Sequence, residues 1–177
     1  MDFQPFDIVG GEMKRYGRDE DGGYVIYNNP LGATHLLGYG VGSDLSFENE
    51  LTAAWGIQAH VFDHTITELP EVGPNVTYVK EGIGAIDADP MFTLDTHIKK
   101  YIPDGSNFIL KIDIEGGEWD IIKTADFSRV SQLIIELHEL QDDHWEDIKR
   151  LNENFYLVHI HGTNCHNQPW TCIDRIH

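Results

Sequence analysis

Short apolar runs rich in β-branched residues alternate with amphipathic stretches along most of this chain. This alternation is typical of βαβ units, in which helices join parallel strands and cover the sheet. We expect strands near residues 34–39, 58–63, 75–80, 107–114, 131–138 and 155–161, and helices near residues 44–56, 91–101, 117–125 and 142–153. The pattern therefore predicts an α/β fold with a doubly wound, mostly parallel sheet and helices on both faces.

The two ends of the chain are predicted to differ from this repeating core. A turn around Arg15–Arg18 and a short strand around 21–26 precede Asn28-Asn29-Pro30, which breaks the chain. The last residues, 170–177, are predicted to form one short strand that returns antiparallel. For 177 residues we expect one domain, 1–177, with an N-terminal turn and strand extension over 1–33 and the core over 34–177.

The charge of the chain is strongly negative, at -18 from 30 acidic and 12 basic residues. Such a field repels polyanions, so we expect no nucleic acid and no anionic membrane among the partners. No apolar stretch of about 18 residues predicts a transmembrane helix, and the start of the chain does not resemble a signal peptide. The expected location is therefore cytoplasmic. Cys165 and Cys172 lack metal or redox spacing, which leaves free thiols and a single disulfide both open.

A glycine-rich loop follows the first strand of the core and indicates a ligand. Glycines at 38, 40 and 42 would let the backbone approach that ligand closely, with Tyr39 between the first two. The dinucleotide pattern G-x-G-x-x-G fails here, because Ser43 or Leu45 stands where its third glycine is needed. A plain tight turn remains the alternative to a ligand-binding loop.

An acid ends the next strand, where it could accept hydrogen bonds from the two hydroxyls of a ribose. This residue is Asp63, which follows Gly42 by 21 residues, and His64 would line the same rim. A helix cap or a surface acid is the alternative for Asp63 taken alone. The order of strand, glycine loop, helix, strand and acid favours a nucleotide-type cofactor, and the failure of the dinucleotide spacing narrows this to an adenosyl ligand.

Charged side chains alternate with apolar ones along the strand expected at 107–114. Lys111, Asp113 and Glu115 would share one face, and Glu136 and His138 would share a face of the next strand. A lysine within a central strand is costly unless it is paired, so we predict a Lys111–Glu136 ion pair. Asp113, Glu115 and His138 come at the carboxyl ends of their strands, where open α/β sheets bind ligands.

The string Ile112–Trp119, IDIEGGEW, resembles the IDxEGxE signature of FkbM-type methyltransferases. The segments that also match that family are Asp21–Tyr24, Gly38–Gly42, Ile134–His138 and His159–Gly162. The resemblance implies a Rossmann-like fold of the class I methyltransferase type, with about seven strands. It also implies S-adenosylmethionine as the cofactor and transfer of its methyl group to a hydroxyl of a small-molecule or carbohydrate acceptor, such as a sugar or natural product.

On this interpretation each candidate residue has a role. Asp113 would face the methionine end of the cofactor, and His138 or Glu115 would be the base that removes the hydroxyl proton. The residues expected to contact the cofactor are Gly38, Tyr39, Gly40, Gly42, Asp63, His64 and Asp113.

A divalent metal is the less favoured variant of the same site. It would use Asp113, Glu115 and His138 together with three later histidines, His159, His161 and His166. In the usual strand order of this fold, the final strand separates the strand of His159 from that of His138. We therefore assign no residue as a metal ligand.

Two other classes of function remain as alternatives. A non-catalytic protein could retain the fold as a binding module, although the acidic residues at 113, 115 and 118 are all present. A metal-dependent hydrolase or glycosyltransferase could use Asp113 and Glu115, but neither chemistry needs the glycine loop. The oligomeric state is left open.

Overall fold

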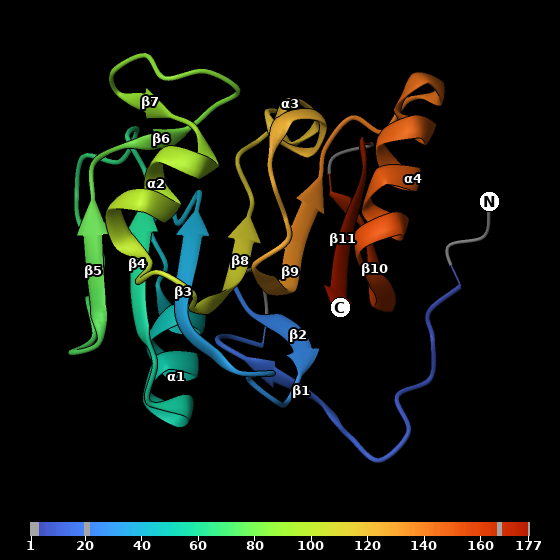
Figure 1. Cartoon of the computed structure of the whole chain (residues 1–177), viewed down its shortest axis with the longest axis horizontal. Coiled ribbons are helices and arrows are strands. Elements are labelled where there is room, and N and C mark those ends of the chain that lie inside the picture. Colours follow the sequence, from blue (N-terminus) through green and yellow to red (C-terminus); the bar gives the residue numbers. More distant parts are fainter. Residues whose placement is uncertain (1–3, 20–21, 166–167, 177) are drawn as a thin grey trace.

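The computed structural model describes residues 4–19, 22–165 and 168–176, and its centre is a seven-stranded sheet (Figure 1). The strands are β3 (Ala33–Tyr39), β4 (Gln58–Phe62), β5 (Val76–Val79), β8 (Asn107–Ile112), β9 (Val130–Leu137), β10 (Tyr156–Cys165) and β11 (Gln168–Ile176). Their order is β10-β11-β9-β8-β3-β4-β5, in which β11 runs antiparallel to both of its neighbours and the pairs from β5 to β9 are parallel. The predicted doubly wound sheet of about seven strands, with an antiparallel return at its end, is confirmed.

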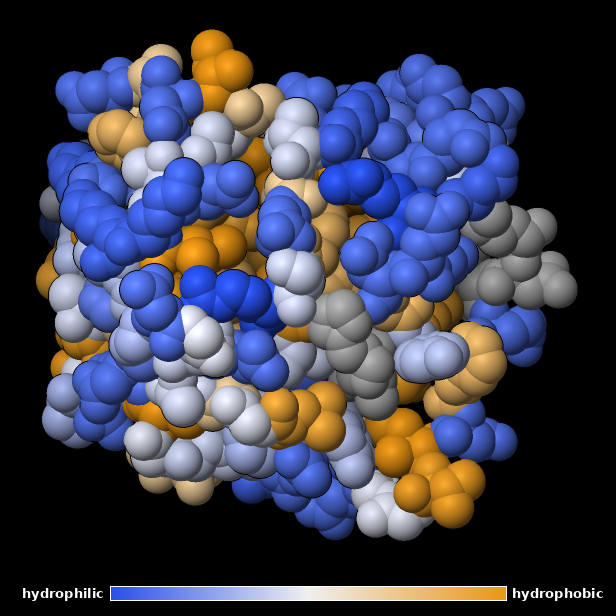
Figure 2. Space-filling model, in the orientation of Figure 1, coloured by the Kyte–Doolittle hydropathy of each residue, from blue (hydrophilic) through white to orange (hydrophobic). Residues whose placement is uncertain are grey.

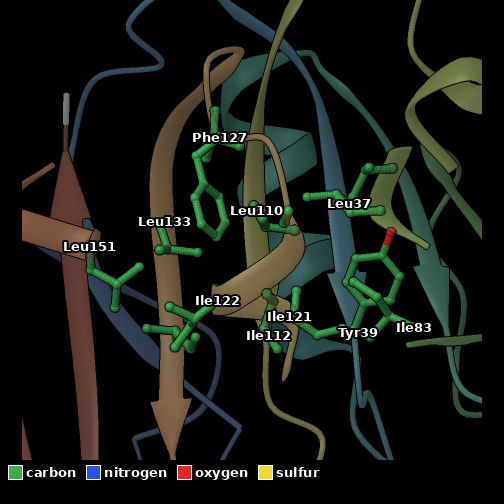
Figure 3. Close-up of a cluster of buried hydrophobic side chains, with 14 of the residues drawn as sticks. Leu37, Tyr39, Ile83, Leu110, Ile112, Ile121, Ile122, Phe127, Leu133 and Leu151 are labelled. Carbon is green, nitrogen blue, oxygen red and sulfur yellow. The ribbon is translucent and has the colours of Figure 1, made fainter. Parts of the chain in front are cut away.

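Helices cover both faces of the sheet, as predicted. One face packs on α1 (Ser46–Trp55), and the other packs on α2 (Leu94–Tyr101), α3 (Glu118–Thr124) and α4 (Trp145–Asn154), which follows a short 3-10 turn, η1 (Asp142–His144). Side chains alternate between the faces, so Ile109 packs on the α1 side and Leu110 on the other. Figure 3 shows Leu110 and Leu133 of the sheet beside Ile121 and Ile122 of α3, in the core on the α3 side of the sheet.

Local signals determined some helix ends and not others. Gly56 ends α1 in the left-handed conformation, with φ of +66° and its N–H donating to the carbonyl of Thr52, which agrees with the helix expected over 44–56. The helix expected from residue 91 begins only at Leu94, because the Thr93 side chain caps it. The preceding residues, Met91–Phe92, form strand β7, which pairs with β6 (Gly82–Ile83) in a small separate sheet.

The N-terminal extension is a hairpin of β1 (Met13–Tyr16) and β2 (Tyr24–Tyr27), of which the sequence predicted only the turn and the second strand. The hairpin lies on the α1 side of the sheet, where the ring of Tyr24 packs edge-on against Phe47 of α1, with 5.1 Å between centroids. This packing brings Tyr24 to the carboxyl ends of the central strands.

Acidic and other hydrophilic residues cover the part of the surface formed by α3 and α4 (Figure 2). Among the helices of the described residues, none is long and apolar enough to cross a membrane. The cytoplasmic location stays a prediction.

Removing the imidazole of His97 is expected to make the protein less sensitive to acid. This side chain is fully buried, 2.9 Å from the Tyr39 hydroxyl and 3.2 Å from Glu81 Oε2. Burial lowers the pKa of His97 more than Glu81 raises it. Below about pH 6.5 the unfolded chain therefore binds a proton that the folded chain resists, so stability falls as pH falls.

The measurement is the free energy of unfolding in denaturant at about pH 7 and about pH 5. His97→Gln retains hydrogen-bonding groups for Tyr39 and Glu81 but does not titrate. We expect the variant to lose less stability than the wild type over this interval. Equal losses in the two proteins would show that His97 is not the source of the acid sensitivity.

Candidate active site

A cleft of about 1200 Å³ opens at the carboxyl ends of the central strands. The predicted site residues that line it are Tyr39, Gly40, Gly42, Asp63, His64, Asp113, Glu115 and His138. Gly38 does not line the cleft and lies within β3, where an added Cβ would come 3.3 Å from Glu48 Oε1. The structure thus brings together nearly all of the residues that the sequence selected.

The turn after β3 requires glycine at one position for a steric reason. Gly40 has φ of +70°, and a Cβ placed on it would lie 1.5 Å from the carbonyl oxygen of Asp113. The Gly40 N–H donates to the carbonyl of Phe62, and the Asp113 N–H donates to that of Tyr39, so β3, β4 and β8 remain in close contact here. Gly42, with φ of +53°, has no atom within 4 Å of an added Cβ and faces open space.

Asp63 connects the glycine turn to the loop after β4. Its Oδ2 accepts the Gly42 N–H at 3.0 Å, and its Oδ1 accepts the N–H and hydroxyl of Thr65 at 2.8 and 2.6 Å. Burial would raise the pKa of Asp63, but these hydrogen bonds outweigh it and hold the pKa below the ordinary value. The side chain is therefore a fixed carboxylate at the edge of the cleft.

A buried histidine faces the cleft beside several carboxylates. His138 is 3% exposed, and its Nδ1 lies 2.7 Å from Glu118 Oε1. Glu118 is fully buried and also accepts the N–H groups of Ile114 and Gly116, so its carboxylate acts as an acceptor and the Nδ1 of His138 carries the proton. The Nε2 atom of His138 then faces Glu115 Oε2 at 3.5 Å and Asp113 Oδ1 at 3.9 Å.

The surroundings of His138 make it more basic than an ordinary histidine. Burial lowers its pKa, but the hydrogen bond that His138 donates to Glu118 and the charges of Glu118, Glu115 and Asp113 together raise the pKa above the ordinary value. Glu115 is at the rim, with its side chain 79% exposed and its backbone at φ of +59°, a conformation that costs energy for a non-glycine residue.

Lys111 has a different partner from the one predicted. Its ammonium lies 3.7 Å from Glu48 Oε1 of α1 and 4.9 Å from the ring centroid of Tyr24. The pairing with Glu136 was predicted from the neighbouring strands alone. The carboxylate that lies beside Lys111 belongs instead to Glu48 of α1, the helix that covers this face. Glu136 instead lies 4.0 Å from His138 Nε2.

The histidines near the end of the chain are arranged as the strand order predicted. His159 and His161 line the cleft from β10, and β11 separates β10 from β9 and His138. His166 and the side chains of Cys165 and Cys172 lie outside the described residues. Among the described residues, a group with metal-ligand spacing consists of Asp113, Glu136 and His138, whose ligand atoms lie within 4.8 Å of one another.

Sequence reasoning missed the supporting contacts of this cluster. Tyr24 donates its hydroxyl to Asp113 Oδ2 at 2.8 Å, across 89 residues of sequence. Glu118 was noted only as part of an acidic segment, although its spacing after Asp113 places it in the first turn of α3, beneath His138. A tyrosine after a glycine pair carries no local signal for such a contact.

Comparison with known proteins finds a family model that matches most of the chain. The family model described as "Methyltransferase FkbM domain" matches residues 20–165. No curated protein sequence matches.

Solved structures resemble the chain more distantly. Sp1610 of Streptococcus pneumoniae, assigned to tRNA (m1A22) methylation and solved with S-adenosyl-L-methionine, is 13% identical with a TM-score of 0.48, over 83% of this chain and 67% of that one. An rRNA methylase from Streptococcus thermophilus is 12% identical with a TM-score of 0.43, over 83% and 88%.

Both of these proteins are described as RNA methylases, which contradicts the expectation that nucleic acid is excluded. That exclusion was wrong because it used the charge of the whole chain. Net charge describes an average field over the whole molecule and does not by itself exclude a polyanionic partner.

Proposed function

The chain belongs to the FkbM methyltransferase family, and on that premise we propose that it transfers the methyl group of S-adenosylmethionine to a hydroxyl oxygen of a sugar-like or small natural-product acceptor. The observation that carries the proposal is the Glu118–His138 pair, which faces the cleft beside Glu115 and Asp113. A hydroxyl must lose its proton to become a good nucleophile, and this cluster is where a proton can be received.

The residues along the glycine turn fit the cofactor. Gly40 and Gly42 line the cleft, the position of Gly42 faces open space, and Asp63 supplies a carboxylate at the same edge for the ribose hydroxyls. His64 lines the same part of the cleft, and Asp113 would face the positively charged methionine end. When bound, S-adenosylmethionine supplies the electrophilic methyl carbon of its sulfonium group, and the acceptor oxygen bonds to that carbon as the carbon–sulfur bond breaks.

The protein's own contribution is positioning and proton transfer. Glu118 holds the imidazole of His138 in one orientation, and Tyr24 holds the carboxylate of Asp113. Glu115 Oε2 and His138 Nε2, 3.5 Å apart, would share the proton that leaves the acceptor hydroxyl. Fixed groups of this kind favour reaction because little reorganisation is needed in the transition state.

Binding of S-adenosylhomocysteine tests the proposed cofactor site directly. A ligand at 100 times its dissociation constant stabilises the folded protein by about 2.7 kcal/mol, so we expect a clear rise in melting temperature and a measurable heat in calorimetry. Adenosine alone serves as the control for the contribution of the methionine end. Absence of any binding would contradict the proposal.

Transfer of a labelled methyl group tests the reaction itself. The acceptor panel contains sugars, small hydroxyl compounds and an RNA pool, and product analysis distinguishes methyl on oxygen from methyl on nitrogen. We expect oxygen methylation of a small hydroxyl compound. Cofactor binding without transfer to any of them would favour a non-catalytic binding module instead.

A further inference from the structure

We propose that Asp113, Glu136 and His138 form a binding site for one divalent cation in the wall of the cleft. Binding of the cation stands on its own geometry, and only its suggested role, holding the acceptor hydroxyl, rests on the proposed function. The three side chains come from the carboxyl ends of β8 and β9, two neighbouring parallel strands.

The distances within this group fit an ion better than direct bonds. His138 Nε2 lies 3.9 Å from Asp113 Oδ1 and 4.0 Å from Glu136 Oε1, beyond hydrogen-bond range. Ligand atoms about 2.1 Å from a metal lie about 3 to 3.5 Å from one another, so small side-chain rotations bring these atoms to an ion placed between them.

Two of the three ligands are held from behind by other residues. Glu118 Oε1 binds His138 Nδ1 at 2.7 Å, and the Tyr24 hydroxyl donates to Asp113 Oδ2 at 2.8 Å. These bonds leave Nε2 and Oδ1 facing the centre of the group. A carboxylate behind the imidazole is the usual support of a metal-binding histidine, since it fixes the tautomer and strengthens the ligand.

The local charge also favours a bound cation. Asp113, Glu115 and Glu136 all lie within 4.0 Å of the same imidazole nitrogen, so their negative charges converge on one small volume. Of the described basic residues that line the cleft, Lys111 lies 3.7 Å from Glu48 and Arg18 lies 3.3 Å from Asp44. A divalent ion at the centre of the group would offset the mutual repulsion of the carboxylates.

One imidazole with two carboxylates suits Mn²⁺ or Zn²⁺ better than Ca²⁺, which prefers oxygen ligands only. An ion here would lower the pKa of an acceptor hydroxyl placed beside it. With the ion on His138 Nε2, that nitrogen could no longer take part in receiving the proton. Glu115, which is outside the ligand set and exposed at the rim, would receive it alone.

The experiment is calorimetry of the chelator-treated full chain with Mn²⁺ alone and with Zn²⁺ alone, together with the electron paramagnetic resonance spectrum of Mn²⁺. We expect one ion per chain. Glu136→Gln removes a ligand, and Glu118→Gln weakens the support of His138, which is expected to cost 10- to 100-fold in affinity. Glu153→Gln, an exposed residue of α4, makes the same change of charge elsewhere.

Wild-type binding that is weakened by Glu136→Gln and Glu118→Gln but not by Glu153→Gln would support the cation site. No stoichiometric binding, or equal affinity in all four proteins, would overturn it. S-adenosylhomocysteine binding by the metal-free protein is measured in parallel. If the protein binds S-adenosylhomocysteine but no cation, the cation site is rejected and the proposed function is retained. If it does not bind S-adenosylhomocysteine, the proposed function is rejected and the cation result is judged separately.

Discussion

Asp63→Ala is expected to weaken S-adenosylhomocysteine binding by about 100-fold or more, a loss of about 3 kcal/mol. Asp63 would accept hydrogen bonds from the ribose, and it also holds the glycine turn through the Gly42 N–H at 3.0 Å. The substitution removes both contributions. It also leaves the N–H and hydroxyl of Thr65 without their acceptor.

Calorimetry measures this loss, and two controls separate its causes. Asp63→Asn keeps the shape of the side chain but removes the charge that supports strong hydrogen bonds, so we expect an intermediate affinity. Glu68→Ala removes an exposed acid from the same loop and is expected to bind as the wild type does. An Asp63→Ala protein that is folded, as judged by its melting curve, and binds with unchanged affinity would show that the ribose lies elsewhere.

The strands of the large sheet could be predicted because each has a signal within its own stretch of sequence. Runs such as 107–112 and 130–137 are rich in isoleucine, leucine and valine and are buried along nearly their whole length, as is usual for strands covered on both faces. Strands β6 and β7 were missed because each has two residues, held by bonds such as that from the Gly82 N–H to the Pro90 carbonyl. Such pairing depends on how the loop folds back, and residue type does not encode it.

The site was predictable where one strand end is followed directly by its functional side chain. Asp63 and Asp113 were found in this way, because the carboxyl ends of parallel strands meet at one edge. The partner of Lys111 was predicted wrongly, since strand alternation says nothing of which helix residue covers the strand. Tyr24 was missed for the same reason: the hairpin reaches Asp113 through packing on α1, over a large separation in sequence.

Gly40→Ala is expected to destabilise the fold by about 4 kcal/mol or more and to abolish S-adenosylhomocysteine binding. The methyl group would lie 1.5 Å from the Asp113 carbonyl oxygen, so β3 and β8 must separate at the point where the Asp113 N–H bonds to Tyr39. Gly42→Ala is the matched control, because its φ of +53° carries a similar conformational cost of about 1–2 kcal/mol but no atom lies within 4 Å of the new methyl. Denaturant unfolding of both variants separates the clash from the conformational cost. If the Gly40→Ala and Gly42→Ala variants proved equally stable, the close contact with Asp113 would not explain the glycine at position 40.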